Sequence, residues 1–543
     1  MAEFTNNTEN KSSAVPGRLK DPLPEMSTRL YGVLTAVLFV LFAFLLFYRV
    51  TEIPIPYNVD EAGMAYDAVS LVNYHCDRYL YRFPVYFVNF GGGQNALYTY
   101  LAAVLIRLFG YSVLIVRLPA ILLSLISALV FTLMIRREYG NTASVLAAAF
   151  FCTLPFSIMH SRWGLESYLL FPMLIISLAA FSRAAETSKT GWFFLSGVLF
   201  GLTLYSYTVS YLLLPVFLGG LLIRLLAVHR LSGKNFLAFA IPLVLMAVPL
   251  VLMLAVNSGM IDEIRTRFFS VPRFLLFRAG EISPRHILTH LKPDGKNIFY
   301  NLFVNDYCAY NIIPKFGSMY YLTIPVMIYG FIRSLRGIGK SRTGKAFSPD
   351  PVMVWLFFVT FVQCLMFEGI NANRGCAVFV PLIYFCVAGL HGILKKSRII
   401  FVGFCAVYLV IFGLFLNHYF RKFPETVGKD SMFASAADIS DALEFAEERV
   451  SENGMIYVLD SVQPHIYVLL AKQVDPYTFM QQRILANDYF VKIFDRYRFR
   501  FDAVVPDCAY ILNALNEIPE EFRTSPLETK QFNTVTVYYP GEE

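Results

Sequence analysis

Charged residues are scarce in this chain, and their scarcity excludes most soluble proteins. Asp, Glu, Lys and Arg make up 16% of the 543 residues, whereas hydrophobic residues make up 56%. A soluble globular fold does not need so much apolar surface, so the composition predicts a polytopic membrane protein. The basic residues lie in short loops and not in one patch with interleaved aromatics, which argues against a nucleic-acid-binding protein.

Several familiar motifs are missing too. The eight cysteines show no CxxC pair and no zinc-ligand spacing, which excludes the common structural zinc sites. Gly91-Gly92-Gly93-Gln94 lacks the Lys-Ser/Thr ending of a P-loop, and we interpret its glycines as a flexible hinge in preference to an anion-binding helix start. No secretory cleavage site is visible near the start, so we expect the first apolar run to be retained.

Eleven apolar runs have roughly the length and composition of membrane-spanning helices. They occupy about 28–48, 114–135, 143–160, 168–184, 192–209, 211–228, 236–256, 318–335, 352–368, 375–394 and 399–417. Aromatic residues reach 16%, which suits helices anchored at membrane interfaces. Residues 1–27 are polar and are expected to form a disordered tail.

The loops after the even-numbered runs carry most of the basic residues. Arg136-Arg137 follows the second run, for example, and Lys395-Lys396 follows the tenth. By the positive-inside rule, these loops and the N-terminus are cytoplasmic. The odd-numbered runs then end on the extracytoplasmic side.

A shorter apolar stretch, residues 95–108, decides this topology. Its hydrophobic residues recur at helical spacing, so we interpret it as an amphipathic helix in the outer interface. Residues 62–72 show a similar pattern. If 95–108 spanned the membrane instead, every later loop would change sides.

The last stretch, 418–543, has the character of a soluble domain. Runs at 455–459 and 534–538 resemble strands, and 440–450 has a helical pattern. The sequence therefore predicts an all-α membrane domain at 28–417, followed by a small extracytoplasmic α/β domain.

An acidic pair, Asp60-Glu61, directly follows the first run. A carboxylate beside hydrocarbon is costly and usually has a function. Alternatively, Asp60 caps the helix expected at 62–72, which would not exclude a chemical role.

Four further polar residues, and a fifth weaker candidate, are expected on the same side. His160, Arg162 and Glu166 fall between the third and fourth runs, where they form either a binding site or a local ion pair. Arg374 follows the ninth run and either snorkels to the interface or binds an anion, because guanidinium geometry suits phosphate. Arg117, which opens the second run, is the weaker candidate for anion binding.

The order of these motifs resembles that of GT-C-type integral membrane glycosyltransferases, close to the protein O-mannosyltransferases and bacterial aminoarabinose transferases. The likeness is strongest over roughly the first 210 residues. It rests on Asp60-Glu61-Ala62, Leu108-Phe109-Gly110, Arg117-Leu118-Pro119, Arg136-Arg137-Glu138-Tyr139-Gly140 and Ser161-Arg162 with Glu166. Two positions depart from the pattern: Glu166 stands where relatives often have Asp, and Gly91 to Gln94 where relatives often have a His or Pro pair.

The resemblance implies the GT-C fold and an inverting transfer of a sugar from a polyprenyl-phosphate donor to an acceptor hydroxyl. Asp60 would be the general base. Glu61 and Glu166 would orient the acceptor or a divalent cation, Mg²⁺ or Mn²⁺. No cofactor is certain, and metal dependence stays open.

The remaining candidates would bind the donor or acceptor. Arg374 and Arg162 would hold the lipid phosphate, with Arg117 and His160 as further substrate-binding residues. The acceptor could be a protein, a lipid or a wall polymer, and the expected location is the bacterial plasma membrane.

Two other functions stay open at this point. A transporter or flippase of lipid-linked sugars would also have many helices, but transporters place polar residues near the midplane and often show internal repeats. A membrane-anchored sensor would leave the motif order of the first 210 residues unexplained.

Overall fold

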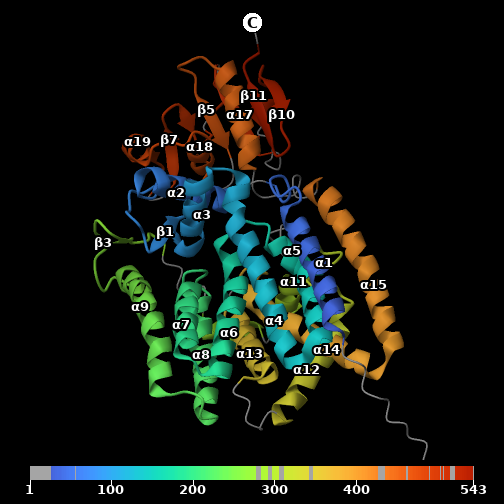
Figure 1. The fold of residues 1–543 in the computed structure, drawn as a ribbon. Coiled ribbons are helices and arrows are strands. Elements are labelled where there is room, and N and C mark those ends of the chain that lie inside the picture. The colour runs from blue at the N-terminus through green and yellow to red at the C-terminus, as the bar shows by residue number, and fades with distance from the viewer. Residues whose placement is uncertain are drawn as a thin grey trace, which may run out of the picture.

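A bundle of apolar helices forms one part of the molecule, and an α/β layer covers its upper end in Figure 1. The structure is a computed structural model that describes residues 26–541, except for 56, 277–282, 291–295, 305–310, 341–346, 368, 426–434, 460–462, 488–489, 502, 506 and 514–519. The tail predicted at 1–27 lies outside the described residues, apart from 26 and 27.

Each of the eleven predicted runs coincides largely with helix. The bundle contains α1 (Thr28–Phe47), α4 (Val113–Thr153), α6 (Leu170–Thr187), α7 (Thr190–Leu204), α8 (Ser210–Ala227), α9 (Gly233–Asn257), α12 (Thr323–Lys340), α13 (Pro349–Leu365), α14 (Phe379–Lys396) and α15 (Arg398–Asn417). Two of the predicted runs share α4, which is kinked at Gly140, where φ is 80°. Within the described residues, seven helical segments are long and apolar enough to cross a membrane, so the count of eleven spans stays a prediction.

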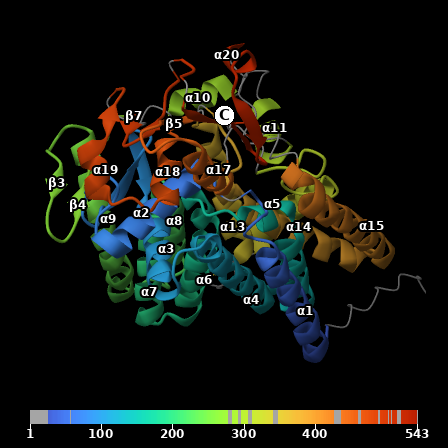
Figure 2. The same cartoon turned by 90° about the horizontal axis from the view of Figure 1, so that it is seen from above.

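The outer helices keep apolar faces exposed. Seen from above, α9 and α15 lie on opposite sides of the bundle (Figure 2). Val40 of α1, Leu245 of α9 and Leu409 of α15 are among their exposed side chains. Apolar surface of this kind is expected where helices face lipid, because the bilayer core is the solvent there.

The two amphipathic segments form helices between the bundle and the α/β layer (Figure 1). They are α2 (Val59–Tyr74) and α3 (Ala96–Phe109), joined through an antiparallel hairpin of β1 (Tyr86–Asn89) and β2 (Gly92–Asn95). The glycines that we interpreted as a hinge therefore form the turn and second strand of this hairpin. A Cβ at Gly93 would lie 2.2 Å from Cε1 of Tyr86, so the close pairing requires glycine.

The C-terminal layer contains a seven-stranded mixed sheet of order β10-β11-β9-β5-β8-β7-β6. Its strands are β5 (Ile456–Leu459), β6 (Ile484–Leu485), β7 (Val491–Phe494), β8 (Tyr497–Arg498), β9 (Ala509–Asn513), β10 (Glu528–Gln531) and β11 (Val535–Tyr539). Its helices are α17 (Ala436–Arg449), α18 (His465–Ala471), α19 (Pro476–Gln482) and α20 (Glu520–Arg523). The predicted strand-like runs correspond to β5 and β11, and the predicted helix lies mostly within α17.

Short elements complete the described chain. They are α5 (Pro155–His160), η1 (Glu166–Leu169), β3 (Ile264–Arg265), β4 (Ser270–Val271), α10 (Pro284–His290), α11 (Lys296–Phe303), η4 (Cys376–Val378) and η5 (His418–Lys422).

The C-terminal layer is attached directly to α2. The Tyr66 hydroxyl donates to the Val474 carbonyl at 2.6 Å, and the Ala436 N–H donates to the Tyr57 carbonyl at 3.1 Å. Apolar side chains of α2 and α18 also share one core cluster. The layer thus helps to fix the helix that carries the acidic pair.

Candidate active site

A polar cavity of about 230 Å³ opens beside the first turn of α2. The β1–β2 hairpin, the start of η1 and the segment before η4 form its other walls. The lining residues are Asp60, Asn89, Phe90, Gly93, Gln94, Leu165, Glu166, Ser167, Tyr207, Asn371 and Asn373. Two carboxylates and four amide side chains therefore come together from distant parts of the chain.

Asp60 is half-buried at the edge of this cavity. Its Oδ1 accepts a hydrogen bond of 3.5 Å from the Asn89 side chain, which also donates to Gln94 at 3.3 Å. The helix is capped by Asn58, whose side chain accepts from the Glu61 N–H at 2.9 Å. The alternative that Asp60 is the N-cap is therefore wrong.

Glu166 supplies the second carboxylate of the cavity. It begins η1, and its Oε2 accepts a hydrogen bond from the backbone N–H of Asn95, the N-cap residue of α3. Glu166 thus holds the start of α3 while it also lines the cavity. Glu166, from the loop between the third and fourth predicted runs, therefore lines the same cavity as Asp60.

Glu61, in contrast, is fully buried and does not line the cavity. Arg117 donates to both of its oxygens, at 2.9 Å from Nε and 2.8 Å from the terminal nitrogen. The N–H of Gly164 donates to the same carboxylate. The guanidinium also donates to the carbonyls of Val50 and Pro54, at 2.7 and 3.0 Å, and to that of residue 55.

Arg162 is buried as well, and it binds backbone instead of facing the cavity. Its terminal nitrogens donate to the carbonyls of Leu45 and Leu46, in the last turn of α1, and to those of Tyr48 and Ile53 just beyond. These carbonyls would otherwise be unpaired where the helix ends. The spacing of Arg162 and Glu166 allowed a local ion pair. Both residues lie in the described part of the chain, and the structure shows no ion pair between them.

His160 and Arg374 also lie outside the cavity lining. The His160 ring stacks on Phe156 and lies tilted against Tyr168, with ring centroids 4.5 and 3.9 Å away. Arg374 is half-buried and donates to the Gly369 carbonyl at 2.7 Å. Asn373 lines the cavity and is its neighbour in sequence, so Arg374 lies on a segment that reaches the site.

A second buried charged group joins α2 to the chain that follows it. The Arg78 guanidinium donates to Asp67 at 2.6 Å, and the Asp77 carboxylate accepts from the N–H groups of Tyr79 and Tyr81, both at 2.9 Å. Burial, followed by the nearby charge of Asp67, raises the pKa of Asp77 to about 8. Burial, followed by the charge of Arg78, lowers the pKa of His465 to about 3.

With this geometry established, comparison with known proteins decides the fold. Residues 95–254 match the family model of dolichyl-phosphate-mannose-protein mannosyltransferases, and no curated protein matches the chain. Apo ArnT from Cupriavidus metallidurans superimposes with a TM-score of 0.55 at 13% identity, over 95% of this chain and 99% of that one. The chain therefore shares the fold of this ArnT structure.

A second structure of ArnT, bound to undecaprenyl phosphate, gives a TM-score of 0.54 at 12% identity, over 95% of this chain and all of that one. The predicted GT-C fold is thus confirmed over nearly the whole chain, and the chain is an integral membrane protein.

Some residues that line the cavity could not be predicted from the sequence. The hairpin and packing between distant helices bring these residues to the cavity, and no sequence motif includes them. They are Asn89, Phe90, Ser167 and Tyr207. Gly91 could have suggested the hairpin, because glycine is typical of hairpin turns. In the structure Gly91 has a φ of 73°, which such turns require.

A metal ion in this cavity would need oxygen ligands in addition to the two carboxylates. Within the described ranges, no three His, Cys, Asp or Glu side chains gather as metal ligands. Asp60 and Glu166 line the same cavity as the amides of Asn371 and Asn373. Carboxylate and amide oxygens are ligands that hard divalent cations accept, so the residues are compatible with Mg²⁺ or Mn²⁺, whose presence stays a prediction.

Proposed function

We propose that the protein transfers a sugar from a polyprenyl-phosphate carrier to an acceptor hydroxyl, with inversion, on the extracytoplasmic side of the membrane. The observation that carries this proposal is the cavity in which Asp60 and Glu166 face one space at the end of an apolar helix bundle. The GT-C fold supports it, and so does the family model matched by residues 95–254.

Asp60 is the general base in this proposal. It would accept the proton of the acceptor hydroxyl while that oxygen bonds to the anomeric carbon and the bond from that carbon to the phosphate oxygen breaks. Asp60 is preferred over Glu61 because it lines the cavity, whereas both oxygens of Glu61 are held by Arg117. A positioned base contributes on the order of 10² to 10⁴ in rate.

The other polar groups would orient the substrates. Glu166 and the amides of Asn89, Gln94, Asn371 and Asn373 offer donors and acceptors that suit sugar hydroxyls. If a divalent cation takes part, it would neutralise charge on the departing phosphate.

The donor phosphate is assigned to Arg374. Guanidinium groups bind phosphate well, and Arg374 follows Asn373 on a wall of the cavity. Arg162 is excluded from this role in our proposal because its terminal nitrogens bind the carbonyls after α1. Glu61, Arg117 and His160 are likewise assigned to holding the site together and not to contacting substrate.

The distribution of loop charge supports the extracytoplasmic assignment. The cavity lies near the start of α14, since Asn371 and Asn373 precede that helix, whereas Lys395 and Lys396 close its other end. Basic residues favour the cytoplasmic side, so the cavity would lie opposite.

The direct test supplies purified protein in detergent with polyprenyl phosphate carrying a radiolabelled sugar, together with a membrane and envelope extract as the acceptor source. We expect free lipid phosphate and a labelled acceptor to form together. If the protein instead moved the intact lipid-linked sugar across a vesicle bilayer, without releasing lipid phosphate, a transporter would replace this proposal.

A further inference from the structure

A second cavity, of about 300 Å³, lies among α4, α12, α13 and α14. Asp350 at the start of α13 and His391 near the end of α14 line it. The Asp60 cavity is reached at the other ends of these two helices, through Asn371 and Asn373. The two cavities share no lining residue, so they are separate sites.

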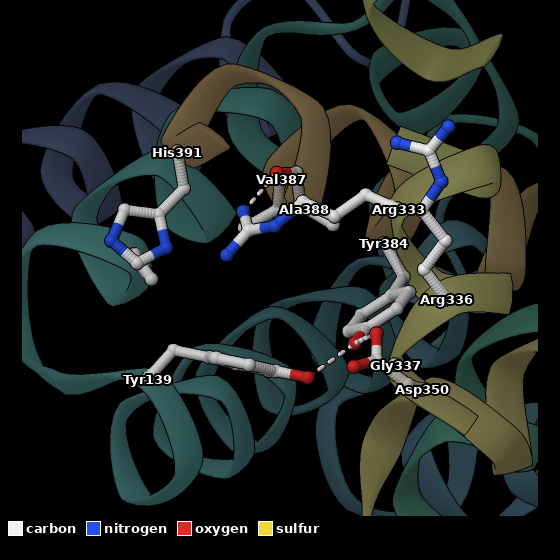
Figure 3. A pocket seen from close by; sticks show the side chains of 10 residues that line it. Tyr139, Arg333, Arg336, Gly337, Asp350, Tyr384, Val387, Ala388 and His391 are labelled. Atoms are coloured by element: carbon white, nitrogen blue, oxygen red, sulfur yellow. Dashed lines mark hydrogen bonds between the residues drawn. The ribbon is translucent and has the colours of Figure 1, made fainter. Parts of the chain in front are cut away.

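Cationic side chains dominate the charge of this second cavity. Figure 3 shows Arg333 reaching across it toward His391, with Tyr139, Tyr384 and Asp350 on the facing wall. Arg333 donates one hydrogen bond, of 2.7 Å, to the Ala388 carbonyl. A guanidinium has five N–H donors, so most of its donors are left for a ligand.

The carboxylate of the cavity is already engaged by a phenol. The Tyr384 hydroxyl donates to Asp350 at 2.6 Å and lies 2.7 Å from the Tyr139 hydroxyl. A Cβ at Gly337 would lie 2.5 Å from Asp350, so glycine allows α12 to approach this group. With Arg333 and Arg336 opposite one carboxylate, the described lining keeps a net positive charge.

We propose that this cavity binds the phosphate of a phospholipid headgroup, with Arg333 across the cavity and the exposed Arg336 at its rim. Its position beside the apolar helices α4, α13 and α14 favours a lipid over a soluble ester, since the glycerol region would meet Ala143 and Val387. Lys395 and Lys396 in the last turn of α14 add to the attraction. By loop charge, this end faces the cytoplasmic leaflet, where anionic lipids attract basic segments. The proposal does not depend on the transfer reaction.

The test measures binding of short-chain phosphatidylglycerol and phosphatidylethanolamine to the purified full chain, by native mass spectrometry and by shift of the thermal denaturation midpoint. Arg333→Gln is expected to weaken binding at least about tenfold, because a charge-assisted hydrogen bond to phosphate is lost. Arg336→Gln, at an exposed position, tests the site without disturbing helix packing and is expected to weaken binding about threefold. Arg230→Gln, exposed in another basic loop, is the matched control.

Competition with inorganic phosphate distinguishes a phospholipid headgroup from free phosphate as the ligand. We expect millimolar phosphate not to displace the lipid. Displacement by phosphate at equal affinity would keep the anion site but overturn its assignment to a lipid. Unchanged lipid binding in both Arg333→Gln and Arg336→Gln, or an equal loss in Arg230→Gln, would overturn the site itself.

Discussion

Two adjacent carboxylates have different surroundings in this protein. Asp60 lines a cavity, whereas Glu61 belongs to a buried ion-pair network. Asp60 is half-buried and faces a space large enough for part of a sugar. Glu61 is fully buried, and Arg117 and Gly164 bind its carboxylate. Polar groups beside a membrane are costly in both places, but only the first place leaves room for a ligand.

The buried network explains how the cavity is held in place. Arg117 binds three backbone carbonyls and Arg162 binds four, all within residues 45–55, which comprise the end of α1 and the chain that leads to α2. These bonds fix where α2 begins and therefore where Asp60 points. The comparison thus separates residues that would do chemistry from residues that position them.

The largest effect is expected at the cavity. Asp60→Asn removes the proposed base but keeps the shape of the side chain, so kcat should fall by about 10² to 10⁴. Its thermal denaturation midpoint should match that of the wild type, since the network is untouched. Asp262→Asn, at a carboxylate whose side chain is 98% exposed, is the control and should keep wild-type turnover.

Removing a charge from the network should act on stability instead. Arg117→Met leaves the Glu61 carboxylate buried without its cation, which costs about 3–5 kcal/mol in comparable buried pairs. The yield of monodisperse protein and the denaturation midpoint report the loss. The double variant Arg117→Met/Glu61→Leu should recover part of it, because no uncompensated charge remains. A single variant as stable as the wild type would contradict the structural role.

Arg374→Ala tests whether the donor phosphate is held near the cavity. The KM for the polyprenyl-phosphate sugar should rise about tenfold, as one charge-assisted contact is lost. The rate at saturating donor should change less than the KM. Steady-state kinetics over a donor series measures both, and an unchanged KM would remove Arg374 from the phosphate site.

A smaller effect is expected from pH at the buried carboxyl group of Asp77, which follows α2. The pKa of Asp77 is raised from its ordinary 3.8 to about 8, so the folded state holds a proton that the unfolded chain releases. Stability from this group is complete below about pH 4 and is lost as the pH rises through about 8. Asp77→Asn cannot titrate and should flatten this decline in the denaturation midpoint between pH 5 and 8.5. An equally steep decline in the variant would assign it to other groups.

The sequence was sufficient to predict the helix bundle, the amphipathic helices and the position of Asp60 and Glu166 at one site. Apolar runs and loop charge are local signals, and they are strong in this chain. The roles of Arg117 and Arg162 could not be read in this way. The partner of Arg117 is Glu61, 56 residues away, and the acceptors of Arg162 are backbone carbonyls that any residue type supplies. Asn89 of the cavity was missed for the same reason, since tertiary packing alone brings it to the site.

The central claim is that two neighbouring carboxylates divide their work, and one measurement tests it directly. Turnover per folded molecule should be determined for Asp60→Asn and Glu61→Gln in the same assay, with the folded fraction taken from thermal denaturation. The account predicts that Asp60→Asn loses at least about 10² in turnover at wild-type stability, whereas Glu61→Gln loses stability but keeps most of its turnover per folded molecule. An equal loss of turnover in both variants, or a larger loss in Glu61→Gln, would contradict it.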